Sequence, residues 1–352
     1  MPLTDYLKEK ISIEVIKTLV TRFENFPEDA SSNRNAPFHE TFLKAFADKL
    51  QGKVSDVPFF ISLSSWLQGL NTTLGQTFFE NVAHHLCNGE KREYTSKKLG
   101  NLQITQTQKD NISNIITDLS NAKVVPNLAD ENESIYTDYE SSFVNALDFS
   151  ADVFFEDEKS VTAIELKSVK PNSGEMRGEK QKIMEGKAAL HRKFPKKNIL
   201  FYIGFPFDPT VDPKKESVTG SNKTRFLGSI INMNKYFDQA ECLVASELWD
   251  FLSGYDKTME QILEIINSIA TPKFLEKFHF LNDTTNRNKS NYLTQLNEWY
   301  LFSERELIQK EETIKGKIGG DKKLIHLYNK SPFDNVGNYN IERYANIIKV
   351  LN

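Results

Sequence analysis

Cysteine is scarce in this 352-residue chain, which contains only Cys87 and Cys242. Two cysteines fit neither the disulfide framework of a small secreted domain nor a structural zinc cluster. Long apolar runs are also missing: the N-terminus lacks a signal-peptide stretch, and no segment approaches the length of a membrane span. These absences argue against secreted and membrane-spanning classes, and they favour a protein of the reducing cytoplasm.

The chain as a whole carries no large excess of charge of either sign, since its formal net charge is only −4. That value argues against a surface that binds polyanions everywhere. The distribution is uneven, however: residues 159–197 contain 11 Lys and Arg but only 4 Asp and Glu, a local balance of +7. A basic segment of this kind suits a phosphate-binding surface, although a charge run alone is more often a solvated helix face.

Apolar spacing predicts three consecutive regions. Residues 1–125 read as mainly helical, and they include a helix over residues 73–86. Residues 126–240 read as a mixed α/β core, in which a hairpin is followed by a helix over 175–194 and a buried strand over 198–205. That strand is expected to lie parallel to the second hairpin strand. Residues 241–352 read as mainly helical again, and no linker separates the regions, so one compact unit is expected.

The hairpin over residues 152–167 is the most informative segment. Asp152 opens one apolar run, residues 156–160 form a charged turn, and Glu165 and Lys167 stand in the second run. Residues two apart in a strand point to the same face, so Glu165 and Lys167 should emerge together. The turn should bring Asp152 back beside Glu165, 13 positions away in sequence. Two carboxylates and an ammonium are therefore expected on one face of the sheet.

This residue set predicts metal-dependent phosphodiester chemistry. Asp152 and Glu165 supply the hard oxygen ligands that suit Mg²⁺, an ion that keeps waters and also takes phosphate oxygens. Such an ion stabilises charge on the phosphate and lowers the pKa of an attacking water. Lys167 would act as an electrostatic stabiliser or as a proton acceptor. An E-x-K triplet alone is a weak signal, since most such charges are surface charges, but here the basic run follows directly.

A helix contributes one further candidate ligand. Glu80 lies on the predicted helix over residues 73–86, and a role as an additional metal ligand and a role as a surface or helix-pairing charge are equally open. His84 and His85 on the same helix resemble a metal pair only superficially. Adjacent positions on a helix diverge, so these histidines are read as structural or surface residues.

Together Asp152, Glu165 and Lys167 resemble the PD-(D/E)xK nuclease fold. The proline that usually precedes the first Asp is Ala151 here. Proline is not a ligand, so the chemistry does not depend on it, but the departure leaves Asp148 as an alternative first ligand. Asp152 is preferred because residues 153–155 continue directly as a strand.

Longer sequence blocks narrow the resemblance, which spans roughly residues 38–299. Residues 74–80, 165–182, 201–209 and 247–254 resemble the TdeIII-type family of type II restriction endonucleases. The resemblance implies a restriction-endonuclease-like α/β core, a mixed central sheet flanked by helices, with large helical N- and C-terminal additions. It also implies Mg²⁺-dependent double-strand cleavage of unmethylated DNA at a short palindrome, of the GGNCC kind. A palindrome is most simply read by a two-fold symmetric homodimer.

Under this hypothesis the polar residues that follow Lys167 become candidate DNA contacts. Phosphate anchoring is the safer assignment for each, because phosphate contacts usually outnumber base contacts, although Arg, Lys, Asn and Gln can also read base edges. The candidates are Lys170, Asn172, Ser173, Arg177, Lys180 and Gln181.

Three other functions are compatible with the sequence. One is another PD-(D/E)xK nuclease that acts in DNA repair or junction resolution. The second is a DNA-binding protein without catalysis, which keeps the charged hairpin for stability. The third is a structural or scaffolding protein, which predicts no Mg²⁺-dependent activity on any duplex.

Overall fold

The computed structural model describes residues 1–27, 37–54, 56–137, 140–167 and 175–351. The chain divides into two compact units, each built from separate stretches of sequence. The first contains residues 1–3 and 79–261, and the second contains residues 4–78 and 262–352. The regions predicted from sequence, 1–125, 126–240 and 241–352, are contiguous, whereas these units are not. Among the described residues, no helix has the length and apolar character needed to cross a membrane.

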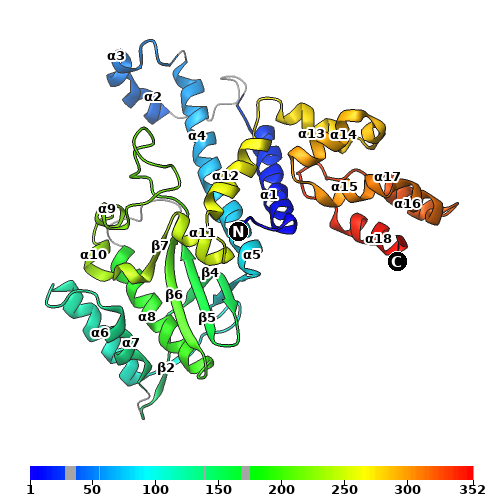
Figure 1. Cartoon of the computed structure of the whole chain (residues 1–352). Coiled ribbons are helices and arrows are strands. Elements are labelled where there is room, and N and C mark those ends of the chain that lie inside the picture. Colours follow the sequence, from blue (N-terminus) through cyan, green and yellow to red (C-terminus); the bar gives the residue numbers. More distant parts are fainter. Residues whose placement is uncertain (28–36, 55, 138–139, 168–174, 352) are drawn as a thin grey trace. The chain divides into compact units, whose positions relative to one another are not determined.

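The first unit contains every strand of the main sheet (Figure 1). Its helices and strands, in chain order, are α5 (Phe79–Cys87), β1 (Glu90–Tyr94), β2 (Gln103–Thr105), α6 (Gln106–Ser120), α7 (Leu128–Tyr136), β3 (Phe143–Asn145), β4 (Phe149–Glu156), β5 (Ser160–Leu166), α8 (Glu175–Lys193), β6 (Asn198–Phe205), α9 (Lys223–Gly228), α10 (Met233–Tyr236), the 3₁₀ turn η4 (Gln239–Glu241), β7 (Cys242–Val244) and α11 (Ser246–Ser253).

The described residues of the second unit form helices and helical turns joined by loops, and they contain no named strand. Its elements are α1 (Asp5–Glu24), α2 (Pro37–Leu43), η2 (Lys44–Phe46), α3 (Ala47–Leu50), α4 (Val57–Thr73), the π-helical turn η3 (Leu74–Phe78), most of α12 (Thr258–Ile269), α13 (Phe274–Asn282), η5 (Thr284–Asn288), α14 (Ser290–Glu298), α15 (Phe302–Gln309), α16 (Glu311–Ile318), α17 (Lys322–Asn329) and α18 (Ile341–Leu351).

The main sheet has the strand order β1-β4-β5-β6-β7. Strands β1, β4 and β5 pair antiparallel, and β5, β6 and β7 pair parallel. The predicted hairpin is therefore present as β4 and β5, and the predicted parallel strand is β6, with the bounds expected from the sequence. This mixed sheet with flanking helices is consistent with the restriction-endonuclease-like fold that the resemblance implies.

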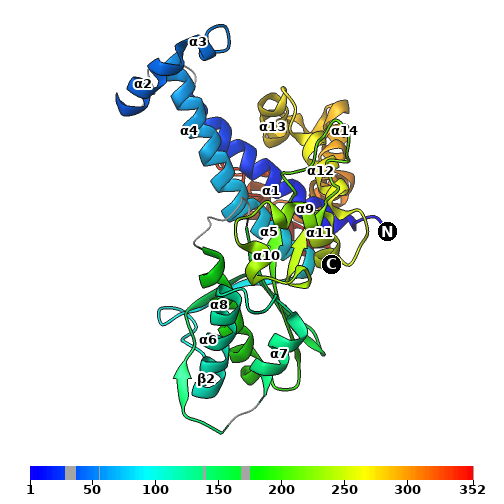
Figure 2. The ribbon, with the colours of Figure 1, turned by 90° about the vertical axis from the view of Figure 1, so that its left-hand side faces the viewer.

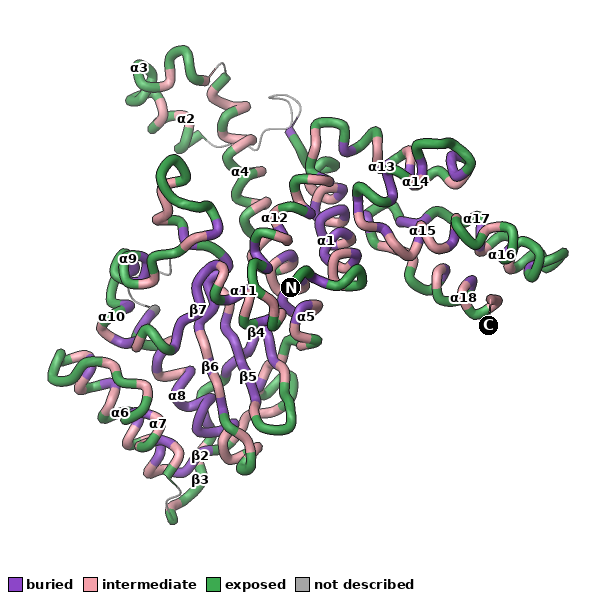
Figure 3. Tube along the Cα trace, in the orientation of Figure 1, coloured by how far each residue is buried: buried purple, intermediate pink, exposed green. Residues whose placement is uncertain are grey.

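Helix α8 covers one face of the sheet, and α6 and α7 pack against it from outside (Figure 2). The contact between α8 and the sheet is close at Gly186, where an added Cβ would lie 3.0 Å from Phe201 and 3.3 Å from Phe149. Buried residues of α6, α7 and α8 form a second core layer that includes Ile112, Ile135 and Met184. The buried segments of this unit accordingly centre on β4, β5, β6 and α8 (Figure 3).

Helix α11 covers the opposite face of the sheet at β6. Gly204 lies in tight contact there, because an added Cβ would meet Ile164, Leu166 and Leu248 at 2.9 to 3.1 Å. Ile164 and Leu166 thus pack beneath α11, whereas Glu165 between them contacts Lys182 of α8. The period-two alternation of a strand therefore directs Glu165 away from the apolar layer, as the sequence predicted.

Candidate active site

A β-bulge shapes the strand that carries Asp152. Glu90 of β1 pairs with Phe154 of β4, and Arg92 pairs with Ala151, so the single residue Lys91 faces both Asp152 and Val153. An extra residue of this kind bends the strand and redirects its side chains, and bulges are common beside active sites. The Asp152 carboxylate then accepts a hydrogen bond from the Leu166 amide at 2.9 Å, which fixes it next to Glu165 across the hairpin.

Glu165 and Lys167 lie side by side, with 3.2 Å between Lys167 Nζ and Glu165 Oε1. Two residues of α8 complete the cluster. Lys182 Nζ lies 3.4 Å from Glu165 Oε1 and 2.8 Å from Glu179 Oε2, and Lys167 Nζ lies 3.5 Å from Glu179 Oε1. Neither Glu179 nor Lys182 was predicted from the sequence to lie in the site. The signal that could have identified them is their i,i+3 spacing on the helix that follows the hairpin.

Glu80 of α5 joins the same cluster through Lys91. Lys91 Nζ lies 3.2 Å from Glu80 Oε2 and 2.9 Å from Asp152 Oδ1, so one ammonium bridges two carboxylates. His84, one turn further along α5, places its Nε2 atom 2.7 Å from the Asp152 carbonyl oxygen. A carbonyl can only accept, so Nε2 carries the proton. His84 therefore holds the backbone of β4 in place, in agreement with the structural role expected for it.

Burial and neighbouring charges together shift the pKa values of the site residues. Burial raises the pKa of Glu165; Lys182 and Lys167 oppose this shift, while Asp152 and Glu179 add to it. Burial also raises the pKa of Glu80, and repulsion from Asp152 adds to the effect. Burial alone would lower the pKa of Lys167, but attraction to Glu165 and Glu179 outweighs it and raises that pKa. Lys167 therefore stands as an ammonium beside these carboxylates.

The carboxylates fit the chemistry of a divalent metal site in one specific respect. Glu165 Oε2 is buried, and none of the described residues donates a hydrogen bond to it. An unsatisfied buried carboxylate oxygen is costly, and a cation would satisfy it. Within the described part of the chain, no three His, Cys, Asp or Glu side chains are already arranged as a metal cage. Lysine ammoniums lie between the carboxylates instead.

Asp148, the alternative first ligand, lies outside this cluster. It precedes β4, and its carboxylate accepts a hydrogen bond from the Asn101 side chain. Asp152 is the residue that contacts Lys91 and the Leu166 amide. The geometry thus groups Asp152, Glu165, Lys167 and Glu80, and it separates Asp148 from them.

The predicted DNA contacts have varied surroundings. Lys170, Asn172 and Ser173 lie outside the described residues. Arg177 is exposed on α8 and Gln181 is half-buried, where it donates a hydrogen bond to Glu185 at 3.0 Å.

The prediction that Lys180 contacts DNA is wrong, because its side chain is fully buried and cannot reach DNA. Its Nζ atom lies 2.5 Å from Glu131 Oε2 and 2.6 Å from Glu241 Oε2, and Lys187 lies 3.3 Å from the other Glu241 oxygen. These residues form an internal ion network that joins α7, α8 and η4. The basic run seen in sequence is therefore not one continuous DNA-facing surface. The sequence alone does not distinguish a buried lysine on a helix from an exposed one, because the acidic partners of the buried lysine lie far away in the sequence.

Comparison with known proteins gives a consistent result over most of the chain. The sequence model of a protein family described as "Type II restriction endonuclease, HinfI" matches residues 3–270. The chain is also 44% identical to a protein named "Type II restriction enzyme MjaII" from Methanocaldococcus jannaschii, over 100% of this chain and 99% of that protein. No solved structure matches.

Replacing Lys180 by Met tests the structural role of the buried network. The change leaves Glu131 without its ammonium in a buried setting, so we expect a loss of about 3–5 kcal/mol in the free energy of unfolding, measured by urea denaturation. The matched control is Lys123→Met, which removes an exposed pair with Asp118 at 3.1 Å. That change should cost at most about 1 kcal/mol. Equal, small effects of the two substitutions would contradict the structural role.

Proposed function

Because the chain belongs to the HinfI family of type II restriction endonucleases, we propose that it makes Mg²⁺-dependent double-strand cuts in DNA at a short palindromic site. The observation that carries the proposal is the grouping of Asp152, Glu165 and Lys167 on one hairpin, with Glu80 beside them. The buried, unsatisfied oxygen of Glu165 supports a cation at this place.

In this proposal Asp152, Glu165 and Glu80 would hold Mg²⁺. When bound, the ion supplies charge neutralisation at the phosphate oxygens and acidifies an attacking water. Lys167 stands as an ammonium beside Glu165 and stabilises the negative charge that develops on the phosphate. His84 keeps Asp152 in position through the backbone. Attack of water on phosphorus breaks the bond to the 3′ oxygen, which leaves a 5′-phosphate and a 3′-hydroxyl.

We propose a GGNCC-like recognition sequence on the basis of the resemblance to TdeIII-type enzymes. The family that matches the chain is HinfI, and both families are type II restriction endonucleases. We also propose that the enzyme acts in the cytoplasm, where its DNA substrate lies, and the free state of Cys87 and Cys242 is consistent with this setting.

A homodimer is part of the proposal, because a two-fold palindrome is matched by two copies that each cut one strand. Helix α4 and its neighbour α2 provide a candidate surface for it. None of the α4 residues Val57–Thr73 is buried, and the helix contains no Asp, Glu, Lys or Arg. Phe38 and Phe42 of α2 are 78% and 74% exposed, and Leu67 of α4 is 52% exposed. Exposed apolar surface of this extent is typical of an interaction site.

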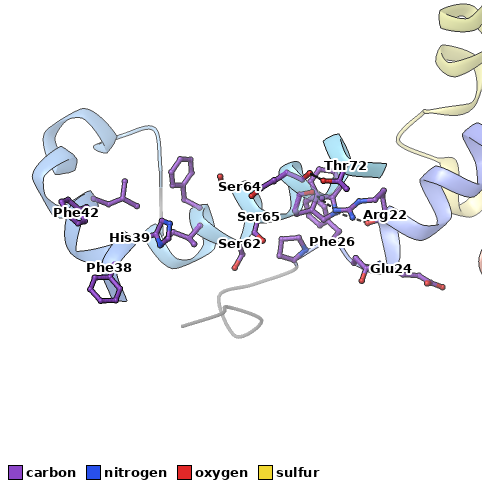
Figure 4. Close-up of a pocket in the computed structure, with 18 residues that line it drawn as sticks. Arg22, Glu24, Phe26, Phe38, His39, Phe42, Ser62, Ser64, Ser65 and Thr72 are labelled. Atoms are coloured by element: carbon purple, nitrogen blue, oxygen red, sulfur yellow. Dashed lines mark hydrogen bonds between the residues drawn. The ribbon is translucent and has the colours of Figure 1, made fainter. Parts of the chain in front are cut away.

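A groove of about 1280 Å³ runs along this surface, lined by residues of α2, α4 and the end of α1 (Figure 4). Two contacts hold α4 against the end of α1 in this groove. Arg22 donates a hydrogen bond to the Trp66 carbonyl at 2.7 Å, and Phe26 packs edge-on against the Trp66 ring. In a two-fold interface each patch meets its own copy, so like charges near the axis repel. Helix α4 contributes no charge, and the groove lining includes one cation and one acid, Arg22 and Glu24, so the surface suits a second copy of this chain better than DNA or a partner of high charge.

Digestion of a mapped plasmid tests the proposed reaction. We expect discrete fragments with Mg²⁺ and no cleavage with a chelator, and end sequencing should show one recurring palindrome with 5′-phosphates. Lys167→Ala should lower the cleavage rate by about 10²-fold or more, because it removes a cation that acts on the developing charge. The variant should still bind DNA carrying the site in a gel-shift assay.

The outcomes separate the alternatives. Cleavage of branched DNA only would favour a repair or junction-resolving nuclease. Site binding without cleavage by the wild type, under all divalent ions tested, would favour a non-catalytic DNA-binding protein. Full cleavage by Lys167→Ala with Mg²⁺ present would reject the role of that lysine. Lys123→Ala, which removes an exposed ammonium elsewhere, should cleave at the wild-type rate.

The dimer surface is tested by the double variant Phe38→Glu, Phe42→Glu, measured by light scattering after size exclusion without DNA. The wild type should have twice the 40.4 kDa mass of the chain. The variant should dissociate at least about tenfold more readily, because it places like charges on both sides of the axis. Ile325→Glu on α17, which also exchanges an exposed apolar residue for a charge, is the control and should remain dimeric. A monomeric wild type, or a variant as dimeric as the control, would overturn the assignment of this surface.

A further inference from the structure

Lys91 belongs to the site cluster, but the proposed reaction assigns it no role. Its ammonium lies 2.9 Å from Asp152 Oδ1 and 3.2 Å from Glu80 Oε2. These two carboxylates come from different elements, β4 and α5, so Lys91 is the residue that links them. Asp152 Oδ2 accepts the hydrogen bond from the Leu166 amide, and Oδ1 is the oxygen that contacts the Lys91 ammonium.

The bulge in β4 gives Lys91 this position. Lys91 is the single β1 residue opposite Asp152 and Val153. Its neighbours are engaged elsewhere: Arg92 pairs with Glu90 at 2.6 Å and its guanidinium lies 3.9 Å from the centre of the Phe154 ring. The strand therefore presents one cation to the site, and neither neighbour is available to replace it.

Two carboxylates held together repel each other, and a cation between them lowers that cost. The Lys91 ammonium lies within hydrogen-bond distance of both carboxylates and so satisfies both acids at once. A divalent cation would seek the same oxygens, and two cations cannot share them at hydrogen-bond distance.

We propose that Lys91 occupies the cation position between Glu80 and Asp152 in the metal-free enzyme and competes with the divalent ion for these carboxylates. The inference rests on the proposed metal site. Lys91 keeps the two ligands assembled before the ion arrives, and it turns aside when the ion binds. Its side chain is 40% exposed, so it has solvent to move into. Lys91 is therefore a positioning residue that sets the affinity for metal.

The test is calorimetric titration of Mg²⁺ into the full-length protein without DNA, so that no cleavage is involved. Lys91→Met should bind Mg²⁺ about tenfold more tightly than the wild type, because a charge-assisted hydrogen bond contributes about 1.5 kcal/mol and 1.4 kcal/mol is a factor of ten. Without metal, the same variant should melt at a lower temperature, since Glu80 and Asp152 lose their counter-ion. Added Mg²⁺ should restore the melting temperature. Lys123→Met serves as the matched control and should match the wild type in Mg²⁺ affinity.

The outcomes are distinguishable from failure of the proposed function. Unchanged or weaker Mg²⁺ binding by Lys91→Met, alongside normal binding by the wild type, would overturn the competition and leave the metal site intact. Equal Mg²⁺ binding by the wild type and Glu165→Gln would contradict the metal site itself, and the inference with it. If Lys91→Met does not fold, Lys91→Gln replaces it: the amide keeps a hydrogen bond but not the charge, and it should still tighten binding. A Gln variant with wild-type affinity would overturn the proposal.

Discussion

Mutual repulsion among carboxylates is the constraint on which the site depends. Glu80, Asp152, Glu165 and Glu179 come from four different elements and would separate if nothing held them. Two kinds of contact hold them: the antiparallel pairing of β4 with β5, and ion pairs with Lys91, Lys167 and Lys182. The first is backbone structure that a change of side chain hardly affects. The second is electrostatic, and it can be redistributed when another cation enters.

Helix α8 connects this site to the interior of the unit. Glu179 and Lys182, three residues apart, face the hairpin, whereas Lys180 and Lys187 face the opposite side and form buried pairs with Glu131 and Glu241. The helical period of 3.6 residues separates the two sets. Gly186 allows the close approach to the sheet that makes both sets of contacts reachable. The buried network therefore fixes the rotation of α8, and that rotation determines which side chains reach Glu165.

The parts of this arrangement that sequence could predict are those set by local period. The position of Glu165 between Ile164 and Leu166, in the run of residues 162–167, predicted that its side chain points away from the apolar layer. The charged turn at residues 156–160 predicted the pairing that brings Asp152 beside it. The β-propensity of its residues was sufficient to predict β6, a short apolar run that forms a buried strand. Lys180 was misassigned because its position in a basic run says nothing about Glu131 and Glu241, which are 49 and 61 residues away. Lys91 was missed because a bulge, which no sequence period reveals, determines what it faces.

The charge of the assembled cluster has a consequence for the order of events in the proposed reaction. Four carboxylates and three ammoniums leave one negative charge where the phosphate of DNA must enter. A site of that sign repels a polyanion at close range, and the repulsion is strongest where side chains are half-buried and screening is weak. On the proposed function, a divalent cation that displaces Lys91 leaves two ammoniums in the cluster, so it brings the net charge to zero. Metal binding therefore does more than activate the water, because it also removes the repulsion between the site and the phosphate. The lysines hold the carboxylates together, but they leave a net charge that opposes the substrate.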